Sequence, residues 1–181
     1  MSLSTGGRFD FDGVDLPSVD GNTSVLLVGD DADALESVSY RLLAGEEPAA
    51  LLHTQASGRA VQRDLNGMQT GAGDSARVLT PEGAATGDGV TVVDDIGDLT
   101  GVGMQLVATL DEVQAAGERF RAGIYLGSDV AASVPDTRSM YRFLNSNFLT
   151  PIRRNGGLGI CAMDTTTDIG ADVDSTLAGM S

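Results

Sequence analysis

Short apolar runs alternate along this chain with stretches in which apolar residues recur every three or four positions. The apolar runs have the length of strands and cover residues 24–28, 49–54, 90–93, 122–126 and 158–163, with a shorter one at Arg77–Thr80. A continuous apolar run is typical of a strand that is buried on both faces of a sheet. We therefore predict six strands and expect residues 24–28 to be buried on both faces.

Helical spacing marks the segments between these runs. One helix is predicted between residues 35 and 42 and is ended by Gly45, and a short polar helix around residues 59–65 precedes a loop at 66–75. Two further helices begin at capping aspartates and carry one apolar stripe each: Leu99, Val102, Leu106, Leu110 and Val113 after Asp98, and Met140, Phe143, Leu144 and Phe148 after Asp136.

Strands that alternate with amphipathic helices are typical of an α/β fold with a mostly parallel sheet and helices on both faces. Residues 1–22 are rich in Gly, Asp and Ser and are expected to form an irregular lead-in. Residues 23–181 have the length of a single domain.

The charge balance narrows the possible functions. The formal net charge is −15, with 26 acidic and 11 basic residues, and every basic residue is Arg. Molar salt shortens the Debye length to about 3 Å and screens such self-repulsion, so we predict adaptation to high salt; an acidic partner-binding face is the alternative. Clustered positive charge is scarce, which argues against nucleic-acid binding. No apolar run approaches a membrane span, and the N-terminus lacks a signal-peptide pattern, so a cytoplasmic protein is expected.

The turn after the first predicted strand is the usual phosphate site of a doubly wound sheet. A phosphate-binding loop there reads GxxxxGK[ST], whereas this chain reads Gly29-Asp-Asp-Ala-Asp-Ala-Leu-Glu36. Ala34 replaces the second glycine, Leu35 replaces the lysine and Glu36 replaces the hydroxyl residue. Asp30, Asp31 and Asp33 add carboxylates, and two like charges about 4 Å apart repel by roughly 4 kcal/mol at a protein surface. This turn is therefore predicted to reject a triphosphate and to need no cofactor.

Three other interpretations of the acidic turn stay open at this point. A receiver-domain site would combine the turn with Asp94 and Asp95 but needs a lysine, which the chain lacks. A cation site of Asp30, Asp31 and Asp94 is conceivable, since hard cations take carboxylate ligands. The simplest interpretation is that Asp30, Asp31 and Asp33 cap the following helix and match its dipole.

The remaining candidates for chemistry have ordinary structural explanations. His53 is the only histidine and Cys161 the only cysteine, so neither a zinc site nor an internal disulfide is expected. Cys161 lies in an apolar run and is expected to be buried. Arg153 and Arg154 form a basic pair near a helix end, where they are solvated or receive an acidic neighbour. Gly97, Gly101 and Gly103 are expected to allow close backbone approach.

Four segments together resemble the haloarchaeal RecA/KaiC-like (HTR-like) family of unknown function, which is related to P-loop NTPases. They lie between residues 16 and 178 and are Leu16-Pro-Ser-Val with Ser24-Val-Leu-Leu-Val-Gly29, Ile96-Gly-Asp-Leu-Thr-Gly-Val-Gly-Met104, Arg121-Ala-Gly-Ile-Tyr-Leu-Gly-Ser128, and Tyr141-Arg-Phe-Leu144 with Gly157-Leu-Gly-Ile and Asp164. The resemblance implies a RecA/KaiC-like core whose phosphate loop is degenerate.

The resemblance also places the second nucleotide motif, the Walker B strand, at residues 122–126. The family's Asp-Ser after that strand is Gly127-Ser128 here, so the magnesium-orienting acid is missing unless the alignment shifts to Asp129. The implied function is a non-catalytic pseudo-ATPase that acts as a protein-interaction or regulatory module, with a protein partner or a second copy of itself. The alternatives are a nucleotide binder with an altered loop and a cation or small-molecule sensor.

Overall fold

The structure, a computed structural model, describes residues 8–11, 17–83, 89–95, 97–116, 119–126 and 137–164. Within them, six strands form one sheet: β3 (Thr23–Gly29), β4 (Ala49–His53), β5 (Arg77–Thr80), β6 (Val90–Val92), β7 (Arg121–Leu126) and β8 (Leu158–Asp164). Their order across the sheet is β3-β8-β7-β4-β5-β6, and all neighbours are parallel. The predicted α/β fold with a parallel sheet is confirmed.

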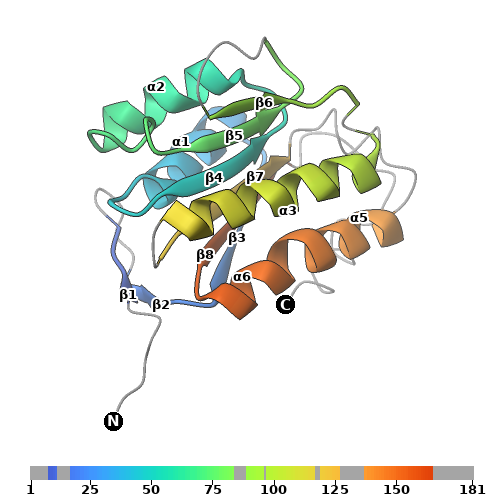
Figure 1. Ribbon diagram of the computed structural model, residues 1–181. Helices are drawn as coiled ribbons and strands as arrows, with labels where there is room; N and C mark the ends of the chain where they lie inside the picture. Colours follow the sequence, from blue (N-terminus) through green and yellow to red (C-terminus); the bar gives the residue numbers. More distant parts are fainter. Residues whose placement is uncertain are drawn as a thin grey trace.

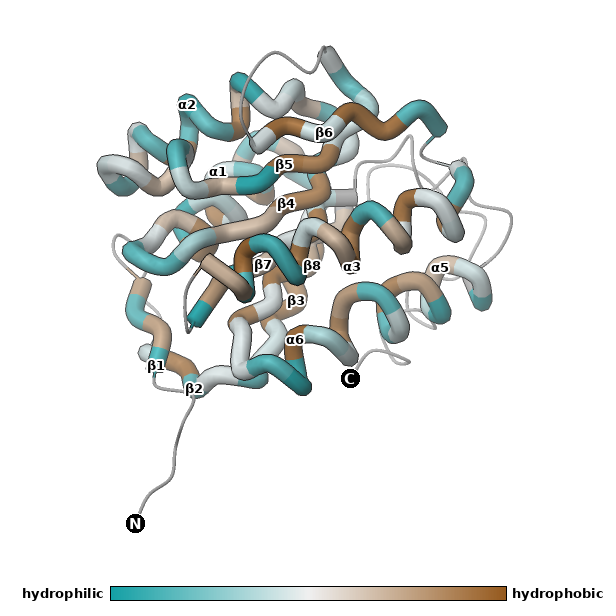
Figure 2. The backbone as a smooth tube through the Cα atoms, viewed as in Figure 1, coloured by the Kyte–Doolittle hydropathy of each residue, from teal (hydrophilic) through white to brown (hydrophobic). Residues whose placement is uncertain are grey.

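Helices cover both faces of this sheet (Figure 1). The first face carries α1 (Ala32–Leu43) and α2 (Gly58–Met68), and the second carries α3 (Leu99–Ala116), α5 (Thr137–Leu144) and α6 (Thr150–Asn155). Each face has its own hydrophobic cluster, and the predicted stripe residues of α3 and α5 belong to the cluster on the second face. Figure 2 shows hydrophobic strands between helices whose residues alternate in hydropathy, as amphipathic packing requires.

One predicted feature of the sheet is wrong. β3 is not buried on both faces: Val25 and Leu27 pack toward α1, whereas Leu26 and Val28 on the other face are 36% and 44% exposed. The reason is position, because β3 is the first strand of the sheet order and pairs with β8 alone among the described strands. An apolar run identifies a strand but does not say whether it is central.

The second correction concerns the predicted loop at 66–75. Helix α2 runs on to Met68, so the first three residues of that loop are helical. Ser57 caps the start of α2 through a hydrogen bond from the Ala60 N–H to its hydroxyl oxygen, at 3.3 Å. The cap and the buried Val61 and Leu65 stabilise this helix. Its polar composition is the reason that the sequence analysis predicted a shorter helix, around residues 59–65.

The segment that connects β7 to β8 contains one widened helical turn. A π-helical turn, η1 (Asn145–Leu149), joins α5 to α6, and the Thr150 N–H donates to the Asn145 carbonyl. Pro151 lies in the first turn of α6 and has no N–H, so the regular hydrogen-bond ladder is interrupted at this point. The widened turn buries Phe148 and Leu149 against the rest of the second face.

A buried arginine links several segments at the end of the sheet where the strands begin. Arg121 at the start of β7 donates to the Leu42 carbonyl at 2.8 Å, to the Asp10 carbonyl at 2.9 Å and to Glu47 at 3.2 Å. An added Cβ at Gly45 would meet its guanidinium, so Gly45 makes room for this side chain. Within the predicted irregular lead-in, β1 (Arg8–Phe9) and β2 (Val19–Asp20) form a short antiparallel pair.

Candidate functional site

The turn between β3 and α1 is capped by its own side chains. The Asp31 carboxylate accepts a hydrogen bond from the Ala34 N–H at 3.1 Å, and Asp33 lies in the first helical turn. Gly29 ends β3, and Asp30 follows it in an exposed position. This hydrogen bond confirms the capping interpretation for Asp31. It also means that one of the N–H groups that a phosphate would need is already bonded to a carboxylate.

The two residues at the lysine and hydroxyl positions of a phosphate loop turn inward. Leu35 is only 7% exposed and packs with Tyr125 and Ala162. Glu36 extends toward the end of β4, where its Oε2 lies 2.8 Å from His53 Nε2. Both positions therefore contribute to the packing of the domain rather than to a phosphate site.

His53 is fully buried at the last position of β4, and both of its ring nitrogens are bonded. Its Nδ1 accepts from the Gln55 and Ala56 N–H groups at 3.1 and 3.0 Å. The proton of the neutral ring must then lie on Nε2, which donates to Glu36. Because both ring nitrogens are already bonded, the geometry agrees with the structural role that the sequence analysis expected for His53.

The topology places the usual ligand crevice between β4 and β7. These strands are neighbours, but the chain continues from β4 to α2 on one face and from β7 to α5 on the other. In open α/β sheets, ligands bind beyond the carboxyl ends of strands at such a switch point. The candidate crevice is therefore at the ends of β4 and β7.

Protein side chains fill this switch point. The His53 and Tyr125 rings stack with centroids 4.6 Å apart. The Tyr125 hydroxyl donates to the Ala32 carbonyl at 3.2 Å, and the Thr54 hydroxyl donates to the Tyr125 carbonyl at 2.9 Å. The ends of β4 and β7 and the start of α1 are thus joined by these contacts at the switch point.

The cation and receiver interpretations of the acidic turn are wrong. Asp30 and Asp31 follow β3, whereas Asp94 and Asp95 follow β6, at the opposite edge of the six-stranded sheet. Five strand spacings of about 4.8 Å separate these edges by roughly 24 Å. Among the described residues, no group of three or more His, Cys, Asp or Glu side chains could hold a metal ion.

Other predicted positions divide into those that the structure describes and those that it does not. Gly127, Ser128 and Asp129, the end of the proposed Walker B strand, and the capping Asp136 lie outside the described residues. Cys161 is buried as predicted, and burial raises the pKa of its thiol to about 12. Asp98 caps α3 by accepting from the Gly101 N–H at 3.2 Å.

The predictions for Gly103 and for the arginine pair are also confirmed. An added Cβ at Gly103 would meet the Asn147 side chain at 2.8 Å, so this glycine allows α3 to approach η1 closely. Arg153 and Arg154 are both exposed in the last turn of α6. They share the α5–η1–α6 segment with the exposed Arg138 and Arg142.

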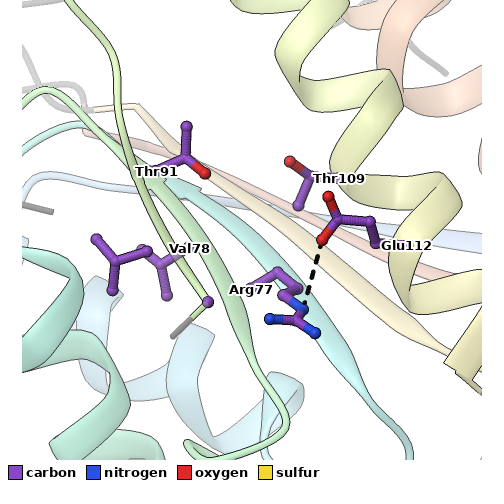
Figure 3. Close-up of a pocket in the computed structure, with 7 residues that line it drawn as sticks. Arg77, Val78, Thr91, Thr109 and Glu112 are labelled. Carbon is purple, nitrogen blue, oxygen red and sulfur yellow. Dashed lines mark ion pairs between the residues drawn. The ribbon is translucent and has the colours of Figure 1, made fainter. Parts of the chain in front are cut away.

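A smaller and a larger pocket lie among the described residues, away from the switch point. The smaller, about 90 Å³, is near the amino ends of β5 and β6, where Arg77 pairs with Glu112 at 3.6 Å beside Thr91 and Thr109 (Figure 3). The larger, about 390 Å³, lies between α1 and α2. It is lined by one side of each helix: Asp33, Glu36, Ser37 and Tyr40 from α1, and Arg63, Asp64, Gly67 and Met68 from α2.

Sequence reasoning missed this larger pocket and the residue at its base. Tyr40 is 3% exposed, and its hydroxyl has no hydrogen-bond partner. Burial above all, followed by the charge of Glu36, raises the pKa of this hydroxyl. The only signal in the sequence is the spacing of Asp33, Glu36 and Tyr40, which places polar groups on one helix face.

These features define an α/β protein with a parallel sheet and a first strand–helix turn closed by its own side chains. The chain belongs to DUF7504, a family of unknown function, whose model matches residues 22–178. No curated protein matches the chain. Among the helices of the described residues, none is long and apolar enough to cross a membrane.

Proposed function

We propose that this chain is a non-catalytic, RecA/KaiC-like pseudo-ATPase that acts as a protein-interaction module in the cytoplasm of a salt-adapted archaeon. The proposal rests on the turn after β3, because residues of this turn already bond to or pack against other parts of the chain. Asp31 caps the helix, Leu35 is in the core, and Glu36 is bonded to His53. A phosphate loop needs free N–H groups, a cation and a hydroxyl at these positions.

The closed switch point supports the same conclusion independently. Opening it for a nucleotide would separate the stacked rings of His53 and Tyr125 and break the Thr54 hydrogen bond. Such buried polar contacts are costly to lose, because each unpaired group costs about 1–3 kcal/mol. Binding there would have to offset this cost in addition to the charge repulsion of the turn.

An interaction surface is available on the other face of the molecule. The residues 137–163 contain no Asp or Glu, although the chain carries 26 acidic residues, and they hold four of the 11 arginines. We call the exposed side of α5, η1 and α6 with Arg138, Arg142, Arg153 and Arg154 the arginine face. Met104 is 70% exposed on α3, the helix that packs against α5, η1 and α6. Arg and Met are enriched in protein interfaces.

The partner that best complements this surface is a second copy of the same chain. The turn after β3 carries Asp30, Asp31 and Asp33 in exposed positions, at a different place from the arginine face. Guanidinium groups and carboxylates form bidentate pairs at contact distance. One copy's arginine face can therefore contact the acidic turn of the next, which gives a head-to-tail assembly.

Calorimetric titration with ATP and Mg²⁺ in about 1 M KCl tests the loss of nucleotide binding, at a Debye length of about 3 Å. We expect no binding, for the native chain or for Asp30→Asn combined with Asp33→Asn, because Leu35 and Glu36 remain in place. Micromolar binding by the native chain would instead support an altered but active nucleotide site.

Sedimentation velocity in the same salt tests the interaction module. We expect association that grows with protein concentration and that Arg154→Glu weakens. Arg59→Glu is the matched control, because Arg59 is an exposed helical arginine on α2, on the opposite face of the sheet. A monomer at every concentration, or an equal effect of the two substitutions, contradicts the assembly.

A further inference from the structure

The pocket between α1 and α2 is an open depression with the size of a small-molecule site. Its volume of about 390 Å³ falls in the range of roughly 300–1,000 Å³ that ligand pockets occupy. Gly67 keeps one wall open, because an added Cβ at this position would meet no atom within 4 Å. Met68, 38% exposed, supplies an apolar wall.

Tyr40 lines this pocket, and its hydroxyl makes no hydrogen bond to the described residues. It is buried and has no partner, although nearly all buried polar atoms in proteins are paired. Its ring lies next to the buried His53, with centroids 6.0 Å apart. The hydroxyl can donate one hydrogen bond and accept another. Neighbouring atoms cover this oxygen, so a ligand with a polar group in the pocket would satisfy it once the lining side chains move aside.

The charges of the side chains around the pocket favour a positively charged ligand. Three carboxylates line it, from Asp33, Glu36 and Asp64, against the single cation Arg63. Arg63 already pairs with Asp64, at 3.3 Å between Nε and Oδ1. Glu36 already accepts the His53 proton through one oxygen, which leaves its other oxygen for a ligand. An anion would be repelled here, and a cation would be attracted.

The arrangement of these groups also favours a cation with N–H donors. The described residues hold no metal-binding cluster of three ligands. A primary ammonium group carries three donors, which suit two carboxylates and the Tyr40 oxygen. We propose that the pocket between α1 and α2 binds a small organic cation with a primary ammonium group on an aliphatic chain. This site is separate from the arginine face, although it shares Asp33 with the acidic turn of the proposed assembly.

Titration calorimetry of the full chain with 1,4-diaminobutane and with spermidine, at constant KCl, tests this site. We expect saturable binding of at least one of the two probes. Tetramethylammonium is the control ligand, because it has the same charge on its nitrogen but no N–H donor. Binding of tetramethylammonium with equal affinity would show a charge effect only and would overturn the proposal, as would the absence of binding by both amines.

Tyr40→Phe and one matched pair of variants locate the binding. Tyr40→Phe removes only the unpaired hydroxyl, and we expect it to weaken the amine about tenfold, since a hydrogen bond to a charged group has about this value. Gly67→Leu fills the pocket and should abolish binding. Ala108→Leu is its control, because Ala108 is exposed on α3, on the other face of the sheet.

The charge contribution has a matched control of its own. Asp33→Asn and Asp111→Asn each remove one exposed carboxylate from a helix, but only Asp33 lines the pocket. We expect weaker amine binding for Asp33→Asn and unchanged binding for Asp111→Asn. Urea unfolding of each variant checks that it is folded. Unchanged affinity in folded Tyr40→Phe and Gly67→Leu proteins would place the amine elsewhere and would overturn the site.

Discussion

Substitution of His53 by alanine tests the structural role of the closed switch point. The ring is fully buried and makes four contacts: the bond to Glu36 at 2.8 Å, the bonds from the two backbone N–H groups of Gln55 and Ala56, and the stack on Tyr125 with ring centroids 4.6 Å apart. Alanine removes all of them at once and leaves a cavity. The change therefore measures how firmly the ends of β4, β7 and α1 are joined.

The size of the effect follows from these contacts. A hydrogen bond to a charged group contributes about 1.5–3 kcal/mol, and an unpaired buried N–H costs about 1–3 kcal/mol. The aromatic pair adds about 0.5–1.5 kcal/mol. Glu36 is partly exposed, so water replaces part of its lost bond. We expect His53→Ala to lower the free energy of unfolding by about 4 kcal/mol, a large share of the ~5–15 kcal/mol of a typical domain.

Urea unfolding in about 1 M KCl, followed by circular dichroism, measures this loss at a salt concentration that screens the net charge. His53→Asn is the informative companion, because its side-chain oxygen can accept from the N–H groups two and three residues on, as Nδ1 does. We expect it to cost less than alanine. A double-mutant cycle with Glu36→Gln isolates the bond between Glu36 and His53.

Two results would refute this account of His53. One is a loss of less than about 1 kcal/mol on substitution by alanine, which is the size of an ordinary substitution. The other is additivity of His53→Ala and Glu36→Gln within about 0.3–0.5 kcal/mol, which is expected of residues that do not interact.

Three further predictions follow from burial and charge. Burial raises the pKa of Cys161 from 9.0 to about 12, so the thiol of the folded protein should resist thiol reagents. The thiol ionises more readily in the unfolded chain, so the free energy of unfolding should fall as pH rises from 9.0 toward 12. Cys161→Ala should lose less stability over this pH range in alkaline unfolding, which checks the sign. Gly73→Ala should destabilise by more than about 1 kcal/mol because its Cβ would strike the Gln62 carbonyl, whereas Gly67→Ala should stabilise by about 0.5–1 kcal/mol in urea unfolding. Raising KCl from about 0.15 M to 1 M should raise the melting temperature, because the Debye length falls from about 8 Å to 3 Å around a net charge of −15; a melting temperature independent of KCl contradicts this prediction.

The candidate site could be predicted only in part from the sequence. The residues Ala34, Leu35 and Glu36 already exclude a phosphate loop, because the chemistry of phosphate binding depends on residue type at fixed spacing. The partner of Glu36 could not be predicted, since His53 is 17 positions away and the two meet only when β4 lies beside the start of α1. The pocket at Tyr40 likewise requires the packing of α2 against α1.

The sequence by itself determined most of the elements, the parallel α/β fold and the absence of a phosphate-loop motif at residues 29–36, because apolar periodicity, capping residues and residue types are local properties. It also determined the burial of Cys161 and of the α3 stripe. Only the tertiary structure decided the strand order, and this order explains two of the errors. It places β3 at an edge, where Leu26 and Val28 are exposed, and separates Asp30 from Asp94 by the width of the sheet. Strand order depends on contacts between segments far apart in the chain, which no local pattern records.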